Sequence, residues 1–180
     1  MSTRIVASSE FVIGELDSPG NIVECIDSQR DASVFVRDTV IEHMLHDSIQ
    51  SFREGKETMG LLLGKPARLG NSIRTIVQGI CRLPVIASAH HVEVNHDSPL
   101  PLPQDVTEDA SSCAFVVGWF HSHTGQGCFL SLTDARTHER WFRQPFAVSA
   151  VIDAADGKIA FFSKEGNRFV SAGYCIFREK

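Results

Sequence analysis

The feature that most constrains the fold of this chain is an apolar run that ends in two histidines separated by one residue. Residues 114–120 are almost entirely apolar, and His121-Ser122-His123 follows them directly. An unbroken apolar run of this length predicts a strand that is buried on both faces. Because alternate residues of a strand face the same side, the two imidazoles should point the same way, with their Cα atoms about 6–7 Å apart.

Two imidazoles at this spacing can share one metal ion if the fold brings a third ligand to them. A glycine-rich loop after the histidines allows the chain to turn back, and residues 131–142 have the pattern of a helix. Ser131 is the expected N-cap, and Asp134 lies in the first turn, where the helix dipole favours a carboxylate. His121, His123 and Asp134 would then form the three-ligand set of a catalytic zinc, with water in the fourth position.

Hydrolysis at such a centre also needs a general base and a group that stabilises the developing oxyanion. Ser131 is a candidate for the second role, because it lies one helical turn before Asp134. Spacing alone does not identify the base, since several glutamates precede the histidines, among them Glu24, Glu42, Glu54, Glu57, Glu93 and Glu108. Glu57 is the best choice, because it begins an apolar run expected to neighbour the strand at 114–120, where an unpaired carboxylate is costly.

The same residues have an ordinary structural interpretation. Histidines two residues apart recur by chance in a chain with 8 histidines, and a serine three residues before an aspartate is a normal capping pattern. On spacing alone, a metal site and a plain capped helix are equally good interpretations. His43 and His46 are expected on a helix surface, whereas His90, His91 and His96 receive little weight as residues that line the site. Cys128 is expected to be a small buried residue, not a nucleophile.

Strands and helices are predicted along most of the remaining chain. A strand at 34–36 precedes a helix over 38–53, for which Asp38 is the expected N-cap and Gly55 the end. Further strands are expected at 57–65, 72–80, 147–153, 158–162 and 169–177. The strands at 57–65 and 72–80 should form one hairpin, and those at 147–153 and 158–162 another. Gly173 should form a bulge or a bend in the last strand. Because the order shows no regular βαβ alternation, an α+β or three-layer fold around one sheet is predicted.

A chain of 180 residues suits one domain with a sizeable core. We expect the main domain to span 34–180. Residues 1–33 should form an extension of unknown role, either a loose tail or a small hairpin between strands at 11–13 and 21–26. Residues 84–112 are the least regular part, and a long irregular segment inside a compact domain is often functional.

Composition excludes some classes of function. The net charge of −5 and the pI of about 5.9 give no support to nucleic-acid binding. No apolar run approaches the roughly 20 residues of a membrane-spanning helix, and the N-terminus has no secretory pattern. The 5 cysteines are scattered and never in CxxC spacing. They predict free thiols in a reducing compartment, and hence a cytoplasmic protein.

The combined motif resembles the signature of a known family. The segment 121–134 reproduces H-S-H-x7-S-x2-D, the JAMM signature of the MPN-domain (Mov34/MPN/PAD-1) metalloproteases. Residues 57–64 resemble the upstream strand of that family, which begins with its catalytic glutamate, here Glu57. The four-part motif is far more specific than the histidine pair alone, and the resemblance extends over most of the predicted main domain.

The resemblance implies a cytidine-deaminase-like α+β fold, with one mixed curved sheet flanked by helices. It also implies a zinc-dependent isopeptidase that cleaves after the C-terminal tail of ubiquitin or a ubiquitin-like protein by means of a zinc-activated water. His121, His123 and Asp134 correspond to the zinc ligands of the family. Glu57 corresponds to its general base, and Ser131 to the residue that stabilises the tetrahedral intermediate.

The sequence departs from the family pattern in the loop after the histidines. The proteasome-lid deubiquitinases, which this stretch resembles most, usually have proline where Thr124 stands and often an aromatic residue where Gln126 stands. Neither is a proposed ligand, so we expect a change in loop rigidity or substrate choice and no change in chemistry.

The compact chain is also similar to prokaryotic members of the family that work beside ubiquitin-like conjugation systems, which implies a link to activating or conjugating enzymes. Two alternatives stay open. One is a catalytically silent MPN scaffold that only binds partners. The other is a metallopeptidase that acts on a sulfur-carrier protein of the ubiquitin fold.

Overall fold

The computed structural model describes residues 14–15, 21–26, 32–69, 71–98 and 115–178. The predicted strand at 11–13 and most of the irregular segment 84–112 after residue 98 lie outside these ranges.

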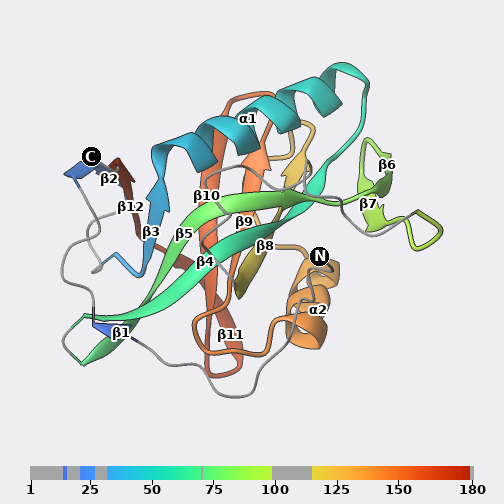
Figure 1. Cartoon of the computed structure of the whole chain (residues 1–180). Coiled ribbons are helices and arrows are strands. Elements are labelled where there is room, and N and C mark those ends of the chain that lie inside the picture. The colour runs from blue at the N-terminus through green and yellow to red at the C-terminus, as the bar shows by residue number, and fades with distance from the viewer. Residues whose placement is uncertain (1–13, 16–20, 27–31, 70, 99–114, 179–180) are drawn as a thin grey trace, which may run out of the picture.

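The described residues form two helices and a series of strands (Figure 1). The strands that precede the central strand are β1 (Gly14–Glu15), β2 (Asn21–Ile26), β3 (Val34–Arg37), β4 (Met59–Leu69), β5 (Ser72–Arg82), β6 (Val85–Ser88) and β7 (His91–Val94). The central strand and those after it are β8 (Phe115–His123), β9 (Val148–Asp153), β10 (Lys158–Glu165), β11 (Arg168–Ala172) and β12 (Tyr174–Arg178). The helices are α1 (Asp38–Arg53) and α2 (Leu132–Trp141).

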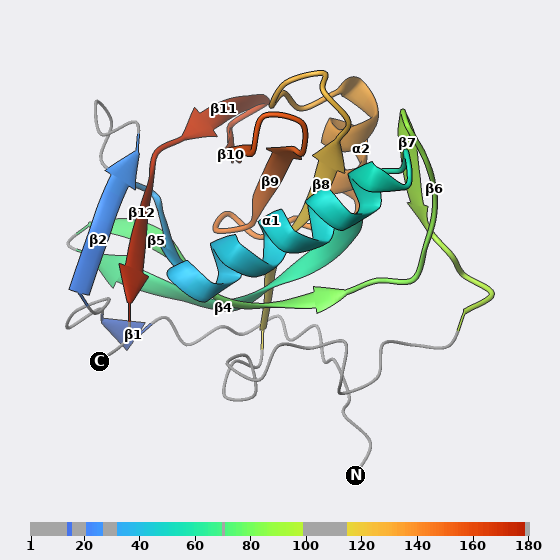
Figure 2. The same cartoon turned by 90° about the horizontal axis from the view of Figure 1, so that it is seen from above.

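One mixed sheet organises the molecule, in the strand order β11-β10-β9-β8-β4-β5-β3-β12-β2, with β1 added beside β4. The neighbours of β8 are β4, which is antiparallel to it, and β9, which is parallel. The sheet is curled, and α1 crosses it while α2 lies apart from α1 (Figures 1 and 2). The predicted α+β fold around one mixed curved sheet is therefore confirmed.

The core lies between α1 and the sheet. Val40, Met44 and Ser48 of α1 are buried at helical spacing, while Ile41 and Leu45 pack against the core at its margin. One face of α1 is therefore buried against the sheet. The predicted N-cap is wrong by one residue, because Arg37 caps the helix without a side-chain bond and Asp38 is its first residue.

The central position of β8 depends on Gly118, which faces Val148 across the pairing of β8 with β9. A Cβ atom at Gly118 would lie 1.9 Å from the carbonyl oxygen of Val148, so only glycine allows this approach. The close parallel pairing continues to the end of β8, where His123 lies opposite Asp153. The pairing of β8 with β9 therefore fixes the positions of His121 and His123.

The prediction of one strand over 169–177 is wrong. β11 pairs with β10, whereas β12 pairs with β3 and β2, and Gly173 separates the two strands. The carbonyl oxygen of Gly173 accepts hydrogen bonds from the backbone N–H groups of Ser33 and Val34. The segment therefore changes sheet partners at Gly173, which brings the two ends of the curled sheet together (Figure 2).

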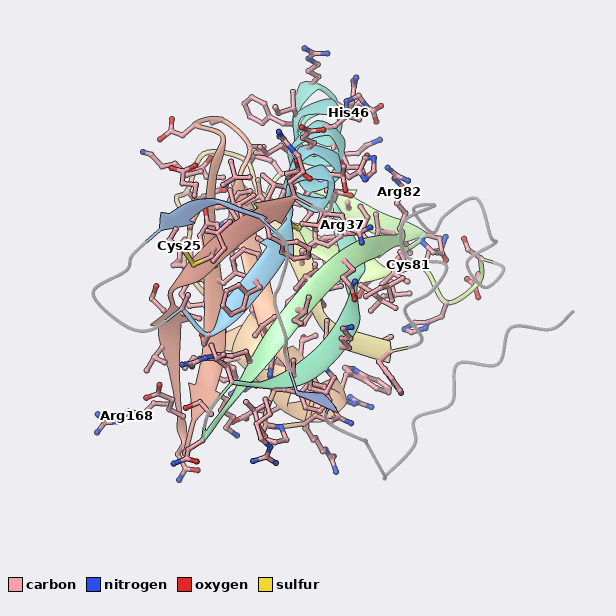
Figure 3. All side chains as sticks on the ribbon, turned by 60° about the vertical axis from the view of Figure 1, so that its left-hand side comes forward. Cys25, Arg37, His46, Cys81, Arg82 and Arg168 are labelled. Carbon is pink, nitrogen blue, oxygen red and sulfur yellow. A yellow bond between two sulfur atoms is a disulfide. The ribbon has the colours of Figure 1, made fainter. Side chains whose placement is uncertain are left out.

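The expectation that all cysteines are free thiols is also wrong. Cys25 of β2 and Cys175 of β12 lie opposite each other in an antiparallel pair, with Cα atoms 4.0 Å apart, and form a disulfide (Figure 3). The two residues are separated by 150 positions in the sequence, so their spacing gave no hint of the pairing. The cysteine pattern therefore no longer supports a reducing compartment.

The described part of the N-terminal extension belongs to the sheet. β2 forms the strand expected at 21–26 and pairs with β12, and β1 pairs with β4. Among the described residues, neither of the two helices is long and apolar enough to cross a membrane.

The segment 84–112 contains a hairpin that the sequence did not predict. β6 and β7 form a two-stranded antiparallel sheet of their own, separate from the main sheet (Figure 1). Its turn lies beside the end of β8, next to the predicted site.

Candidate metal centre

The two histidines at the end of β8 point to the same side, as the alternation of a strand requires. The Nε2 atoms of His121 and His123 lie 3.2 Å apart, and the two residues are only 2% and 6% exposed. Between them, Ser122 faces the other way. Its Oγ accepts a hydrogen bond from the backbone N–H of Thr58, and its N–H donates to the carbonyl oxygen of Thr58. Ser122 thereby fixes the segment next to Glu57.

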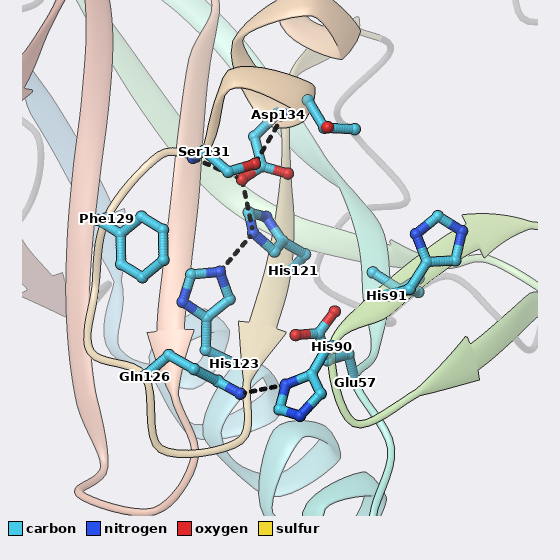
Figure 4. A pocket seen from close by; sticks show the side chains of 11 residues that line it. Glu57, His90, His91, His121, His123, Gln126, Phe129, Ser131 and Asp134 are labelled. Carbon is cyan, nitrogen blue, oxygen red and sulfur yellow. Dashed lines mark hydrogen bonds and ion pairs between the residues drawn. The ribbon is translucent and has the colours of Figure 1, made fainter.

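Asp134 completes the cluster from the first turn of α2. One of its carboxylate oxygens lies 3.5 Å from Nε2 of His121 and accepts a hydrogen bond of 2.7 Å from the backbone N–H of Ser131. The Ser131 hydroxyl in turn accepts from the N–H of Asp134, so the two residues form a capping box. The same residues that start the helix therefore hold the carboxylate beside the histidines (Figure 4).

The electrostatics of Asp134 favour an ionised carboxylate. Burial raises its pKa, but the hydrogen bond and charge of His121 and the hydrogen bonds from Ser131 outweigh burial and bring the pKa to about 2. Among the described residues, His121, His123 and Asp134 are the one group of three whose ligand atoms could converge on a metal, with these atoms all within 4.8 Å of one another.

The loop after His123 fixes the orientation of its ring. Nδ1 of His123 lies 2.6 Å from the carbonyl oxygen of Gly127, so this nitrogen carries the proton and Nε2 keeps its lone pair. Burial lowers the pKa of His123 more than the Gly127 carbonyl raises it, which favours the neutral ring. Gly127 has a φ of +86°, a conformation that favours glycine.

Asp153 supports this arrangement from the end of β9. Its carboxylate accepts hydrogen bonds from the N–H of Gly127 at 2.5 Å and from the N–H of Ala155 at 3.1 Å, and the residue is only 2% exposed. A chain of contacts therefore runs from Asp153 through Gly127 to His123. The sequence interpretation missed Asp153, although this carboxylate lies at the end of a buried strand as Glu57 lies at the start of one.

Glu57 lies just before β4, which begins at Met59, and not within the strand as predicted. It is nevertheless buried, at 6% exposed. Its backbone N–H donates to the carbonyl oxygen of Ser88 in the hairpin. Burial raises the pKa of Glu57, and the charge of His121 only partly offsets this effect. A carboxyl group with a raised pKa accepts and releases protons closer to neutral pH.

A cavity of about 240 Å³ brings these groups together. All five residues singled out from the sequence line it, and so do neighbours from the hairpin and loops, among them His90, His91, Gln126 and Phe129 (Figure 4). The ring of Phe129 lies 4.7 Å from that of His123, between centroids. Sequence spacing singles out neither His90 nor His91, since only the fold of the hairpin places them at the cavity.

The remaining histidines and Cys128 do not line the cavity. His138 is buried and lies 2.7 Å from the hydroxyl of Ser149. Burial and then the charge of Lys164 lower its pKa to about 4. The thiol of Cys128 contacts the carbonyl oxygen of Lys158, and burial raises its pKa, which disfavours the nucleophilic thiolate.

The donor set suits a divalent metal that prefers nitrogen and carboxylate ligands, as zinc does. Two imidazole nitrogens that lie 3.2 Å apart beside an ionised carboxylate repel each other unless a hydrogen atom or a cation lies between them. Nδ1 of His121 is buried and has no hydrogen-bond partner among the described residues, so either nitrogen of this ring can carry the proton and Nε2 is free to bind a metal. The residues therefore fit a zinc ion.

The chain matches a family model described as JAB1/Mov34/MPN/PAD-1 ubiquitin protease over residues 29–143. It is 32% identical to the ubiquitin carboxyl-terminal hydrolase RPN11 of Saccharomyces cerevisiae over 125 residues, which are 67% of this chain and 39% of that protein. It is 34% identical to COP9 signalosome complex subunit 5 of Candida albicans over 104 residues, which are 54% of this chain and 16% of that protein. The chain therefore spans well under half the length of these curated relatives.

A solved structure shares the fold. The solution structure of protein DSY2949 from Desulfitobacterium hafniense matches with a TM-score of 0.54 and 20% identity, covering 81% of this chain and 94% of that chain.

Proposed function

Because the chain belongs to the JAB1/Mov34/MPN/PAD-1 family, we propose that it is a zinc-dependent peptidase acting on ubiquitin or a ubiquitin-like protein. It would cleave the peptide or isopeptide bond that follows the C-terminal tail, releasing the modifier from a conjugate or a precursor. The observation that carries this proposal is the convergence of His121, His123 and Asp134 in one cavity with Glu57.

His121 and His123 would hold zinc through Nε2, and Asp134 through its carboxylate. When bound, zinc supplies a Lewis acid and a water of lowered pKa. The His123 ring is prepared for this role because Gly127 accepts its Nδ1 proton. Asp134 is prepared because its pKa is held near 2, so the carboxylate stays ionised at any working pH.

Glu57 would act as the general base. Its carboxylate takes a proton from the attacking water and delivers that proton to the nitrogen of the leaving amine. Burial raises the pKa of this group, which makes it a better base and a better acid than an exposed glutamate at neutral pH. The hydrogen bond from its backbone N–H to Ser88 holds the segment at the cavity wall.

Ser131 would stabilise the oxyanion that develops on the substrate carbonyl. Its oxygen already accepts a hydrogen bond from the backbone N–H of Asp134, so the hydroxyl proton is left to donate toward the cavity. This role adds to the structural role of Ser131 as the N-cap of α2.

The expected partners are ubiquitin or a ubiquitin-like protein and its conjugates, together with activating or conjugating enzymes of the same system. The test is incubation of the purified protein with fusions of ubiquitin, of ubiquitin-like proteins and of sulfur-carrier proteins of the ubiquitin fold. Cleavage after the tail that stops on chelation and returns with zinc supports the proposal, and the fusion that is cut names the substrate. A zinc-loaded, folded protein that cuts none of them would contradict the proposal and favour the scaffold alternative.

A further inference from the structure

We propose that Thr124 and Gln126 form a clamp that fixes the β6–β7 hairpin as one wall of the substrate cleft. Gln126 is thereby a positioning residue for the substrate, an inference that rests on the proposed function. The clamp would set the distance between the loop that follows His123 and the opposite wall, which carries His90 and His91.

The hairpin depends on such contacts, because its strands form no hydrogen-bonded pairs with the main sheet. β6 and β7 pair only with each other, outside the main sheet. Their side chains are half-buried or exposed, and Ile86 is 53% exposed. An isolated two-stranded hairpin is marginally stable in water. Its position therefore depends on the contacts that its turn makes with the rest of the protein.

Two residues of the loop after His123 form hydrogen bonds to that turn. The hydroxyl of Thr124 donates to the carbonyl oxygen of Ala89 at 2.7 Å. The side-chain amide nitrogen of Gln126 donates to the same carbonyl at 3.3 Å and lies 2.8 Å from Nδ1 of His90. On the other side, the backbone N–H of Glu57 donates to Ser88. The turn is thus joined to the segments that carry the proposed ligands and base.

The side chain of Gln126 is itself held at both ends. Its amide oxygen accepts a hydrogen bond of 2.7 Å from the backbone N–H of Thr124. Its two amide hydrogens have three acceptors within reach, which are Ala89 and His90 on the hairpin and the hydroxyl oxygen of Thr124 at 3.1 Å, so the orientation of the amide is determined by its surroundings. Figure 4 shows Gln126 reaching across to His90 at the edge of the cavity.

Two residues that depart from the family pattern therefore act together. A proline in place of Thr124 would lack both the N–H that holds Gln126 and the hydroxyl that holds Ala89. An aromatic side chain in place of Gln126 would not bond both Ala89 and His90. The clamp is thus a property of this chain, and it would hold the hairpin ready before an extended tail enters between the hairpin and Phe129.

Gln126→Glu tests the clamp with a side chain of nearly the same shape. It keeps an oxygen for the N–H of Thr124 but replaces the donor amide with a carboxylate, which the carbonyl of Ala89 repels. Amide hydrogen exchange on the full chain should speed up about tenfold at residues 88–91, the effect expected from losing one or two hydrogen bonds. KM for the cleaved fusion should rise by a similar factor, with little change in kcat and none in zinc content.

Gln50→Glu on the exposed face of α1 is the matched control and should change neither readout. Unchanged exchange at 88–91 in Gln126→Glu and in Gln126→Met, whose side chain can neither donate to Ala89 nor accept from His90, would overturn the clamp, whether or not the protein cleaves any fusion. Faster exchange with unchanged KM would overturn the positioning role. If the unaltered protein cleaves no fusion, the proposed function fails, and hydrogen exchange alone still decides whether the clamp exists.

Discussion

Nε2 of His121 lies 3.2 Å from Nε2 of His123 in the interior of the protein. Since the Nδ1 proton of His123 is directed at Gly127, the lone pair of its Nε2 faces His121. Asp134 adds an ionised carboxylate 3.5 Å from the same nitrogen of His121. Lone pairs and negative charge are thus gathered in a buried space, which is an environment that a bound cation stabilises.

Glu57→Gln should retain zinc and lose turnover. The amide fills the same space but cannot accept a proton, and general base catalysis contributes about 10²–10⁴-fold to rate. Cleavage kinetics and zinc analysis on the same preparation check this. Glu54→Gln, at an exposed position a few residues earlier, is the matched control and should be unaffected. A Glu57→Gln protein with full activity would remove Glu57 from the mechanism.

Asp153→Asn should weaken zinc binding by about 10- to 100-fold, the usual effect of removing a partner that orients a metal ligand. The asparagine side chain has the same shape as aspartate but lacks the negative charge that attracts the N–H of Gly127. This charge helps to hold Gly127 against the ring of His123. Competition with a chelator of known affinity measures the change. Asp156→Asn, in the exposed turn after β9, should leave the affinity alone. Equal zinc affinities of Asp153→Asn and Asp156→Asn would show that Asp153 does not help to orient the ring of His123.

His138 should make the fold less stable in acid. Its pKa is about 4 in the folded protein, compared with about 6.5 when unfolded, so below pH 6.5 the unfolded chain binds the extra proton. The contribution is fully present above about pH 6.5. It decreases as pH falls toward 4, by about 3 kcal/mol at most.

Urea unfolding at pH 7 and pH 4.5, with chelator present, measures this effect. His138→Gln should lose less stability between these two pH values than the unaltered protein does. His46→Gln, on the exposed side of α1, should behave like the unaltered protein. If the free energy of unfolding changes equally with pH in all three proteins, His138 is not the group responsible for the acid sensitivity.

The Cys25–Cys175 disulfide should stabilise the protein by about 2–5 kcal/mol, because it closes a long loop between β2 and β12. A variant with serine at both positions should unfold at a lower temperature, and reduction of the unaltered protein should lower its Tm by the same amount. Cys128→Ser is the control and should change Tm little. If reduction leaves Tm unchanged, the bond adds no stability in solution.

Much of the site could be predicted from local sequence. The apolar run before His121 places both histidines on one side of a strand, and the Ser131–Asp134 capping pattern places a carboxylate in the first turn of a helix. Glu57 was found because it precedes a second buried strand. Each of these signals lies within one element, where periodicity and capping determine which way a side chain points.

The features that were missed depend on contacts between distant segments. Asp153 reaches Gly127 only because β9 pairs with β8 in one register, and His90 reaches the cavity through a hairpin with a weak sequence pattern. The Cys25–Cys175 pair follows from the pairing of β2 with β12. The residues on either side of Gly173 favour a strand whichever partners they have, so local sequence predicts a bulge or bend there and not a change of partners.

The most direct test of the metal site is the zinc content of the folded protein after reconstitution and removal of free metal. We predict about one zinc per chain, and almost none in His121→Ala, with circular dichroism showing that the variant stays folded. His91→Ala, at the opposite wall of the cavity, should keep its zinc. A folded, unaltered protein that retains no zinc would contradict the proposed centre, and so would a His121→Ala variant that retains it in full.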